Sequence, residues 1–377
     1  MAQGFSLKDQ LFNAEKVRYL AGLFQSAAPE FDANGFSATV MTRLPDLELK
    51  QRIVWIAECL GQHLPGPLPD IAPTLVTALP PPLDPTLTDD DFGDFIFAPL
   101  GELVVLRGLD DHPDLTLDLL SQITQRFSME WALRPMLNRW PDLTLAQLHV
   151  WTDHPNYHVR RLVSEGTRPR LPWGQGIALD PLVPLALLDR LHADPTRYVT
   201  RSIANHLNDI AKSAPDTVID RLQGWTDEGR QTPAELNWMT RHALRSLVKS
   251  GTPRALQVLG YDPVADIQAD VTIRTDPVRI GEVLEFECQI TAPTDTPVLV
   301  DYVLHFQRPG GKVSAKVFKL KQTTAQPGTP LVLTKRHRMK GDATTFQLVP
   351  GAHRLEIQIN GQVRAATGFM LEPALPT

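Results

Sequence analysis

A repeat of 40 residues constrains the fold of this chain more than any other feature. Three similar segments carry an arginine at the same point, Arg161, Arg201 and Arg241, and the apolar positions around these arginines align at the same spacing. A period of this length, with helices entered through a proline, is typical of stacked helix pairs. Stacked pairs bury a shared core and leave a concave surface. The sequence therefore predicts an all-α solenoid over residues 1–262.

The segment from Thr196 to Ala211 shows the helical pattern most clearly. Its apolar residues recur at helical spacing, and they are Val199, Ile203, Leu207 and Ile210. The opposite face is rich in polar groups, namely Arg197, Arg201, Asn205, Asn208 and Asp209. We also expect helices over residues 8–25, 38–44, 47–64 and 117–127, and a Pro- and Asp-rich loop over 77–95. Paired helices at this period resemble HEAT-like repeats.

After Tyr261 the pattern changes to short alternating strands. Seven segments show β-branched or aromatic alternation between turn signals, over residues 269–275, 282–292, 297–307, 313–321, 330–340, 353–360 and 362–371. This number of strands in about 110 residues suits an immunoglobulin-like sandwich, which we place at residues 263–377. Cys59 and Cys288 fall in different predicted domains, so neither a disulfide nor a metal site is expected.

The net charge of −6 hides an uneven distribution along the chain. Residues 1–118 hold 7 Lys and Arg against 18 Asp and Glu, whereas residues 119–262 hold 17 against 14 and residues 263–377 hold 13 against 11. A basic remainder could meet a polyanion while the acidic part stays in solvent, although simple fluctuation of surface charge is the alternative. No apolar run approaches the roughly 18 residues of a spanning helix, and no secretory signal is visible. We expect a cytoplasmic protein without membrane contact.

Two carboxylates of the helical region each lie one helical turn from an arginine. Glu165 follows Arg161 by four residues, and Glu130 precedes Arg134 by the same distance. Both can be exposed ion pairs worth roughly 0.2–0.5 kcal/mol. The exit loop after Glu165 adds further arginines and the indole of Trp173, which favours contacts with phosphate and with a sugar or base.

A third carboxylate, Asp209, also has a purely structural interpretation. It can pair with Lys212 at the surface, or be held by Arg197 and Arg201. The recurrence of carboxylates beside arginines in successive segments argues against this interpretation, because a groove that only binds phosphate would exclude acidic groups. Carboxylates retained among arginines indicate a positively charged target.

Several long segments resemble one protein family. They read SLKDQLFN, FGDFIFAPLGE, SMEWALRPML, HPNYHVRRLVSEGTRPRLPW, VTRSIANHLNDIAK and LNWMTRHALRSLVKSGTPRALQVLGY, and together they cover most of residues 5–262. In these segments the chain looks like the AlkC branch of the AlkC/AlkD superfamily of DNA glycosylases. The Ig-like extension resembles the additional domain of one AlkC subgroup.

The resemblance implies an activity and its partners. The chain would be a monofunctional glycosylase that hydrolyses the N-glycosidic bond of cationic alkylated bases, 3-methyladenine and its relatives, in duplex DNA without flipping the base. Carboxylates would stabilise an oxocarbenium-like transition state and position water, so no cofactor is implied. The enzyme would act as a monomer in the bacterial cytoplasm, associated with the nucleoid. The alternative is a non-catalytic repeat scaffold that binds DNA or protein.

The same resemblance implies roles for individual residues. The catalytic carboxylates would be Glu130, Glu165 and Asp209, with Trp173 close to the lesion. The DNA-binding residues of the helical part would be His158, Arg160, Arg161, Arg168, Arg201 and Arg241. In the sandwich, Lys335, Arg336 and Arg338 would help to encircle DNA, although a charged strand face that prevents edge-to-edge aggregation is an equal alternative.

Overall fold

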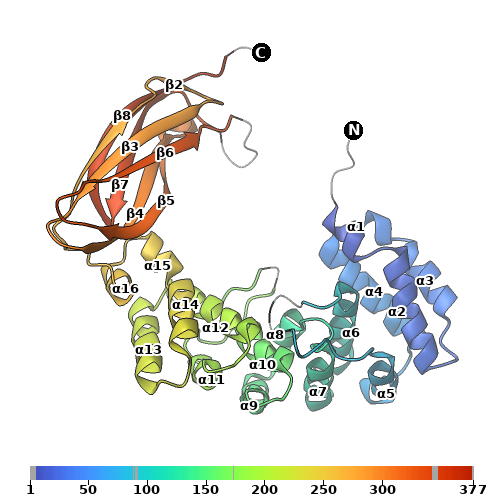
Figure 1. Cartoon of the computed structure of the whole chain (residues 1–377). Helices are drawn as coiled ribbons and strands as arrows, with labels where there is room; N and C mark the ends of the chain where they lie inside the picture. Colours follow the sequence, from blue (N-terminus) through green and yellow to red (C-terminus); the bar gives the residue numbers. More distant parts are fainter. Residues whose placement is uncertain (1–5, 88, 90–91, 173, 342–346, 376–377) are drawn as a thin grey trace. The chain divides into compact units, whose positions relative to one another are not determined.

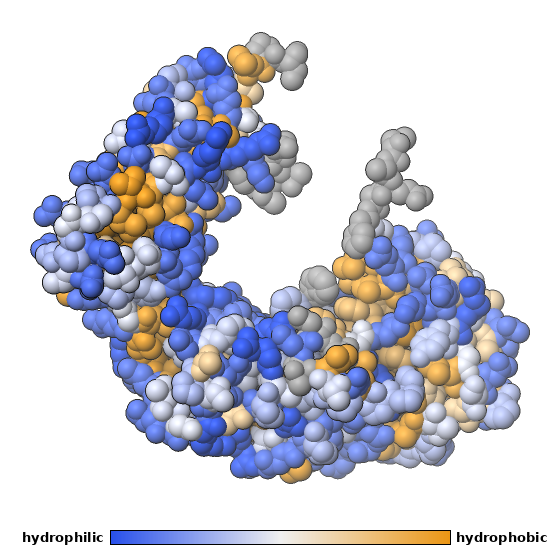
Figure 2. All heavy atoms as spheres, in the orientation of Figure 1, coloured by the Kyte–Doolittle hydropathy of each residue, from blue (hydrophilic) through white to orange (hydrophobic). Residues whose placement is uncertain are grey.

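The computed structural model describes residues 6–87, 89, 92–172, 174–341 and 347–375. Two compact units share the chain (Figure 1). Unit 1 comprises Met1–Ala214 and Asp220–Ala243, and unit 2 comprises Pro215–Ile219 and Leu244–Thr377. Most of the surface visible in Figure 2 is hydrophilic, with apolar side chains in small patches.

Unit 1 is built from helices, and short helices also begin unit 2. The α-helices are α1 Leu7–Leu11, α2 Ala14–Ala27, α3 Ala33–Met41, α4 Leu49–His63, α5 Leu68–Ala78, α6 Ala98–Gly108, α7 Pro113–Ile123, α8 Glu130–Arg139, α9 Pro141–Trp151, α10 Tyr157–Gly166, α11 Leu185–Leu191, α12 Arg197–Ile210, α13 Pro215–Glu228, α14 Pro233–Ala243, α15 Arg245–Lys249 and α16 Pro253–Val258. Short 3-10 turns are η1 Leu44–Asp46, η2 Phe95–Phe97 and η3 Pro309–Gly311.

Alternate helices of unit 1 pack side by side in a row, which we call the main row. It runs α4, α6, α8, α10, α12 and α14, each in contact with the next, while α5, α7, α9 and α11 pack against it. The predicted amphipathic helix is confirmed as α12, whose residues Val199, Ile203 and Leu207 are fully buried. The three repeat arginines fall on α10, α12 and α14, so the 40-residue period corresponds to one step along the main row.

Three predicted helices are wrong in their extent. Those expected over residues 38–44 and 117–127 begin and end earlier, as α3 and α7. The single helix expected over residues 8–25 is divided into α1 and α2 at Asn13. The side-chain oxygen of Asn13 accepts hydrogen bonds from the backbone N–H groups of Glu15 and Lys16, each at 3.1 Å. This N-cap starts a new helix, and it allows the chain to change direction inside an unbroken helical pattern.

Unit 2 contains the β-sandwich. Its strands are β1 Gln268–Ile273, β2 Val278–Arg279, β3 Val283–Thr291, β4 Thr296–Gln307, β5 Val313–Ala325, β6 Leu331–Arg338, β7 Gly351–Ile359 and β8 Gln362–Glu372. Among the described residues one sheet has the order β1-β3-β6 and the other β2-β8-β7-β4-β5. Each of the seven predicted segments forms a strand, and the structure adds the two-residue β2, which pairs in parallel with β8.

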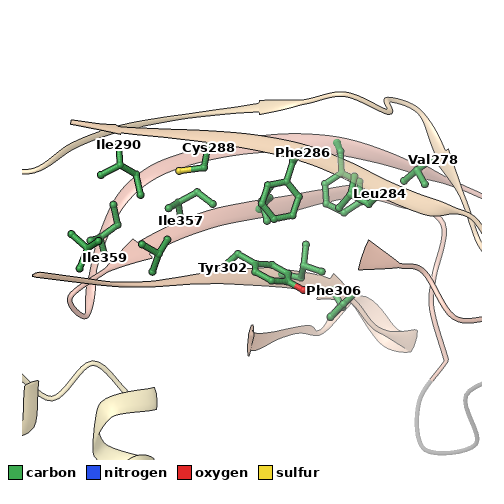
Figure 3. Packing of buried hydrophobic residues seen from close by; sticks show 14 of the residues in the cluster. Val278, Leu284, Phe286, Cys288, Ile290, Tyr302, Phe306, Ile357 and Ile359 are labelled. Atoms are coloured by element: carbon green, nitrogen blue, oxygen red, sulfur yellow. The ribbon is translucent and has the colours of Figure 1, made fainter. Parts of the chain in front are cut away.

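The core of the sandwich lies between the two sheets. Leu284, Phe286 and Cys288 alternate along β3 and point toward β4 and β7, where Tyr302 and Ile357 meet them (Figure 3). The strand period of two puts every second residue on the inner face. The predicted architecture, helical repeats followed by an Ig-like sandwich, is confirmed.

Neither cysteine is bonded, and Cys59 and Cys288 are both buried, one in each unit. Within the part of the chain that the structure describes, no helix combines the length and apolarity needed to cross a membrane. The same residues contain no group of three or more His, Cys, Asp or Glu placed to hold a metal ion.

Candidate active site

The three predicted carboxylates lie on adjacent helices of the main row. Glu130 is the first residue of α8, while Glu165 and Asp209 are each one residue from the end of α10 and α12. A carboxylate near a helix C-terminus meets the negative end of the helix dipole, which costs stability. Cationic groups must therefore compensate Glu165 and Asp209 locally.

Glu165 is held by one hydroxyl and two arginines. Its Oε1 accepts a hydrogen bond from Nη1 of Arg168 at 2.6 Å, and its Oε2 accepts one from Oγ of Ser202 at 2.6 Å. Nη2 of Arg161 lies 3.6 Å from the same Oε2, and the side chain of Glu165 is 7% exposed. Burial alone would raise the pKa of Glu165, but Arg161, Arg168 and Ser202 outweigh it and hold the pKa below its ordinary value. The group is thus a carboxylate at neutral pH.

Arg168 joins Glu165 to Asp209. Besides its bond to Glu165, it donates from Nε and Nη2 to Oδ2 of Asp209 at 3.0 and 2.8 Å. Burial opposes the charge of Arg168, but the two carboxylates raise its pKa. One guanidinium therefore links the ends of α10 and α12.

The structure agrees only in part with the purely structural interpretations of Asp209, a surface pair with Lys212 or contacts with Arg197 and Arg201. Nζ of Lys212 does approach its Oδ1 at 2.9 Å, but the side chain of Asp209 is 7% exposed and does not lie openly at the surface. Arg197 pairs instead with Glu235, and Arg201 pairs with Asp89. Neither arginine holds Asp209 in this structure.

Arg161 connects Glu130 to the same cluster. Its Nη1 donates to Oγ of Ser128 at 2.6 Å, and its guanidinium carbon lies 4.3 Å from the ring centroid of Tyr198. Burial opposes the charge of Arg161, but Glu165, Tyr198 and Glu130 together raise its pKa. Oε2 of Glu130 is buried and has no hydrogen-bond partner among the described residues. Of the buried oxygens of the three carboxylates, it is the one whose hydrogen bonding the described residues leave unsatisfied.

The expected pair between Glu130 and Arg134 does not form. Arg134 is buried and donates to the backbone carbonyl groups of Gly166, at 3.2 Å, and Arg168, at 2.9 Å, and also to that of Gln175. It thereby fixes the loop that leaves α10. At Gly166 an added Cβ would lie 2.4 Å from a methyl carbon of Leu133 on α8, so a larger residue there would force the buried Leu133 side chain to move.

A pocket of ≈ 220 Å³ opens beside Glu165. Its walls are Phe92, Arg161, Glu165, Tyr198, Arg201, Ser202 and Asn205. The pocket combines an ionised carboxylate with aromatic faces, the groups that stabilise positive charge.

The other predicted DNA-binding residues of the helical part differ in their exposure and in their partners. Arg160 pairs with the buried Asp194, with Nε 2.6 Å from Oδ2, and also binds two backbone carbonyl groups.

His158 is 3% exposed. Burial and, to a smaller extent, the charge of Arg161 lower its pKa to about 4. A neutral, buried ring offers no contact to a surface ligand in this conformation. Arg241 is exposed, with Nε 2.9 Å from Oδ1 of Asn237. Trp173 lies outside the described residues.

The three basic residues of the sandwich lie on β6, at one edge of the three-stranded sheet in the described fold. Arg336 and Arg338 are exposed on one face, while Lys335 is half-buried on the other. Nε of Arg336 lies 3.0 Å from Oε1 of Glu285 on β3, and the arginine side chain is 75% exposed. Strand alternation thus separates Lys335 from the two arginines.

Sequence reasoning did not single out Tyr198, Ser202 or Phe92. A signal was present for two of them, because Tyr198 and Ser202 lie about one repeat after Tyr157 and Ser164. No comparable pattern marks Phe92, whose ring meets Tyr198 edge-on at 5.6 Å from within the predicted loop.

The fold and the site together define a class: helical-repeat proteins that carry buried carboxylates beside arginines on the main row and an Ig-like domain after it. The family model described as "Uncharacterised protein YhaZ, C-terminal Ig-like domain" matches residues 268–373. The uncharacterized protein YhaZ of Bacillus subtilis (strain 168) is 33% identical over 367 residues, which is 96% of this chain and 98% of that protein.

A solved structure covers the whole architecture. It is the Pseudomonas fluorescens alkylpurine DNA glycosylase AlkC bound to DNA containing an abasic site analog, with a TM-score of 0.84, 32% sequence identity and coverage of 98% of this chain and 100% of that one. The chain belongs to the AlkC branch of the AlkC/AlkD superfamily, in the subgroup with a C-terminal Ig-like domain. The family predicted from the sequence is thus confirmed.

Proposed function

We propose that this protein is a DNA glycosylase that removes cationic alkylated bases, 3-methyladenine and its relatives, from duplex DNA. One observation carries the proposal: Glu165 is kept ionised in a buried position by Arg161 and Arg168, beside a pocket with aromatic walls. The similar Pseudomonas fluorescens protein is an alkylpurine DNA glycosylase. Residues 1–262 would form the glycosylase domain, and residues 263–377 the Ig-like domain.

The reaction is helped more by a carboxylate anion than by a general acid. A base alkylated on a ring nitrogen is already cationic, so it leaves as a neutral molecule that takes the electrons of the bond to C1′. The positive charge then moves to the deoxyribose, where the carboxylates of Glu165 and Glu130 stabilise it. Water adds to C1′ and gives a proton to a carboxylate or to solvent. No amine nucleophile is used, so the enzyme is monofunctional.

The remaining roles follow from the places of the residues. Asp209 would act with Glu165 through their shared Arg168. Arg201 and Arg241 would contact the DNA backbone, and Trp173 would lie near the lesion. The base would stay in the duplex, since a pocket of ≈ 220 Å³ is small for a flipped nucleotide. We propose a monomer acting in the bacterial cytoplasm at the nucleoid.

The test is release of free bases from methylated DNA. The wild type should release 3-methyladenine above the spontaneous rate, and Glu165→Gln should lower that rate by about 10²-fold or more. Glu58→Gln, at an exposed position of α4, is the matched control and should match the wild type. Binding of DNA without release of any alkylated base would favour the non-catalytic scaffold instead.

A further inference from the structure

Ser202 on α12 donates a short hydrogen bond to Oε2 of Glu165, the oxygen opposite the one that Arg168 contacts. Ser202 is 2% exposed, and its Oγ lies 2.6 Å from Oε2 of Glu165 and 3.0 Å from Oγ of Ser164. A hydroxyl has one proton, and a carboxylate can only accept. The proton of Ser202 therefore goes to Glu165, which leaves Ser164 as the donor in the contact between the two serines.

The neighbouring histidine holds the backbone of the same turn. Nδ1 of His206, which is fully buried on α12, lies 3.0 Å from the carbonyl oxygen of Ser164. A carbonyl oxygen only accepts, so the neutral ring carries its proton on Nδ1. Ser202 and His206 thus tie the last turn of α10 to α12 at two points, one on the backbone before Glu165 and one on its carboxylate.

The hydrogen bond from Ser202 sets the orientation of Oε2 of Glu165, which the two arginines do not set. Arg168 occupies Oε1. Arg161 lies 3.6 Å from Oε2, which is an ion-pair distance and too long for a hydrogen bond. Without the serine hydroxyl, Oε2 can rotate toward Arg161, close the gap of 3.6 Å and lose its fixed place beside the pocket.

We propose that Ser202 is a positioning residue of this site, whose hydroxyl fixes Oε2 of Glu165 beside the pocket and keeps it from collapsing onto Arg161. This inference rests on the proposed glycosylase function. Ser202 does not itself touch the reacting atoms; it acts through Glu165.

The experiment compares single-turnover base release by four variants with the wild type. Ser202→Ala should lower the rate about tenfold to a hundredfold, the effect of one hydrogen bond to a charged group, while the Kd for DNA changes less than about twofold. Ser202→Thr keeps the hydroxyl and should restore most of the rate. Ser202→Cys, a weak donor of similar size, should fall between the two.

The control is Thr200→Val, which removes a buried hydroxyl that the same helix presents to another carboxylate, Glu235. It should leave the rate within about twofold of the wild type.

A second readout separates positioning from folding. Losing a donor to the charged form raises the pKa of Glu165. The acid limb of the pH–rate profile should therefore move to higher pH in Ser202→Ala alone.

Three outcomes overturn the inference: Ser202→Ala no slower than Thr200→Val, Ser202→Thr as slow as Ser202→Ala, or an acid limb that does not move. If Ser202→Ala fails to fold, the Thr and Cys variants still decide, because equal rates in both remove any role for the donor. A wild type that releases no base overturns the proposed function as well, whereas an active wild type with unaffected serine variants overturns only the role of Ser202.

Discussion

Arg168 offers the sharpest test of how the carboxylates are held. Replacing Arg168 by Met keeps an apolar stem of similar length but removes hydrogen bonds of 2.6, 2.8 and 3.0 Å to Glu165 and Asp209. Both carboxylates are 7% exposed, so they have little access to water, and the variant leaves Glu165 with Arg161 and Ser202 and Asp209 with Lys212. Breaking a buried pair from one side costs about 3–5 kcal/mol. Because these partners remain, we expect a loss at the lower end of that range at pH 7.

The pH dependence of this loss has a definite sign. In the wild type the pKa of Glu165 lies below its ordinary value, so the ionised group contributes stability above that value and loses it as the pH falls through the folded pKa. Without Arg168, burial is opposed by Arg161 and Ser202 alone, so the pKa of Glu165 rises relative to the wild type. The difference in unfolding free energy between the variant and the wild type should therefore be largest at neutral pH. It should shrink as acid protonates Glu165.

The assay is denaturant unfolding followed by far-UV circular dichroism at neutral and acid pH. Arg139→Met is the control, because Arg139 and its partner Asp110 are both exposed, and such a pair contributes about 1 kcal/mol or less. Adding Glu165→Gln to Arg168→Met should recover part of the stability at pH 7, since it removes a buried negative charge that has lost one of its two arginines. Equal unfolding of Arg168→Met and Arg139→Met would refute the reasoning.

Three further predictions concern activity and DNA binding. The acid limb of the wild-type pH–rate profile should lie below pH 4.5, the ordinary value for Glu, because the pKa of Glu165 is lowered; a limb above it would contradict an ionised Glu165. Asp89→Asn should remove one acidic neighbour of Arg201 and steepen the salt dependence of DNA binding by up to about one unit of slope, as measured by fluorescence anisotropy; an unchanged slope would contradict this prediction. Arg336→Ala with Arg338→Ala should weaken DNA binding about tenfold without altering the single-turnover rate, and aggregation in place of weaker binding would favour the strand-protection alternative.

The periodic parts of the fold could be predicted because periodicity is local. The 40-residue spacing fixed the helices that carry Arg161, Arg201 and Arg241, and the period of two fixed the strands of the sandwich. The break at Asn13 was missed because the cap interrupts a continuous amphipathic pattern. β2 was missed because two residues show no alternation.

The contact between successive repeats could not be predicted, because its partners are far apart in the sequence. The sequence offers Arg161 as a neighbour of Glu165, and that ion pair forms. Arg168 follows Glu165 by only three residues, but it also bonds Asp209, which lies 41 residues away. Arg168 follows the end of α10 by two residues, and from there it reaches the last turn of α12.

This arrangement changes what the arginine count implies for DNA binding. Four of the arginines expected at the backbone already have acidic partners: Arg160 has Asp194, Arg161 has Glu165, Arg168 has Glu165 and Asp209, and Arg201 has Asp89. An arginine neutralised within the protein releases fewer counterions when DNA binds. The salt dependence of binding should therefore be shallower than a count of these residues suggests. Arg161 and Arg168 serve first to keep Glu165 ionised inside the protein, and a buried anion is what a site for a positively charged group requires.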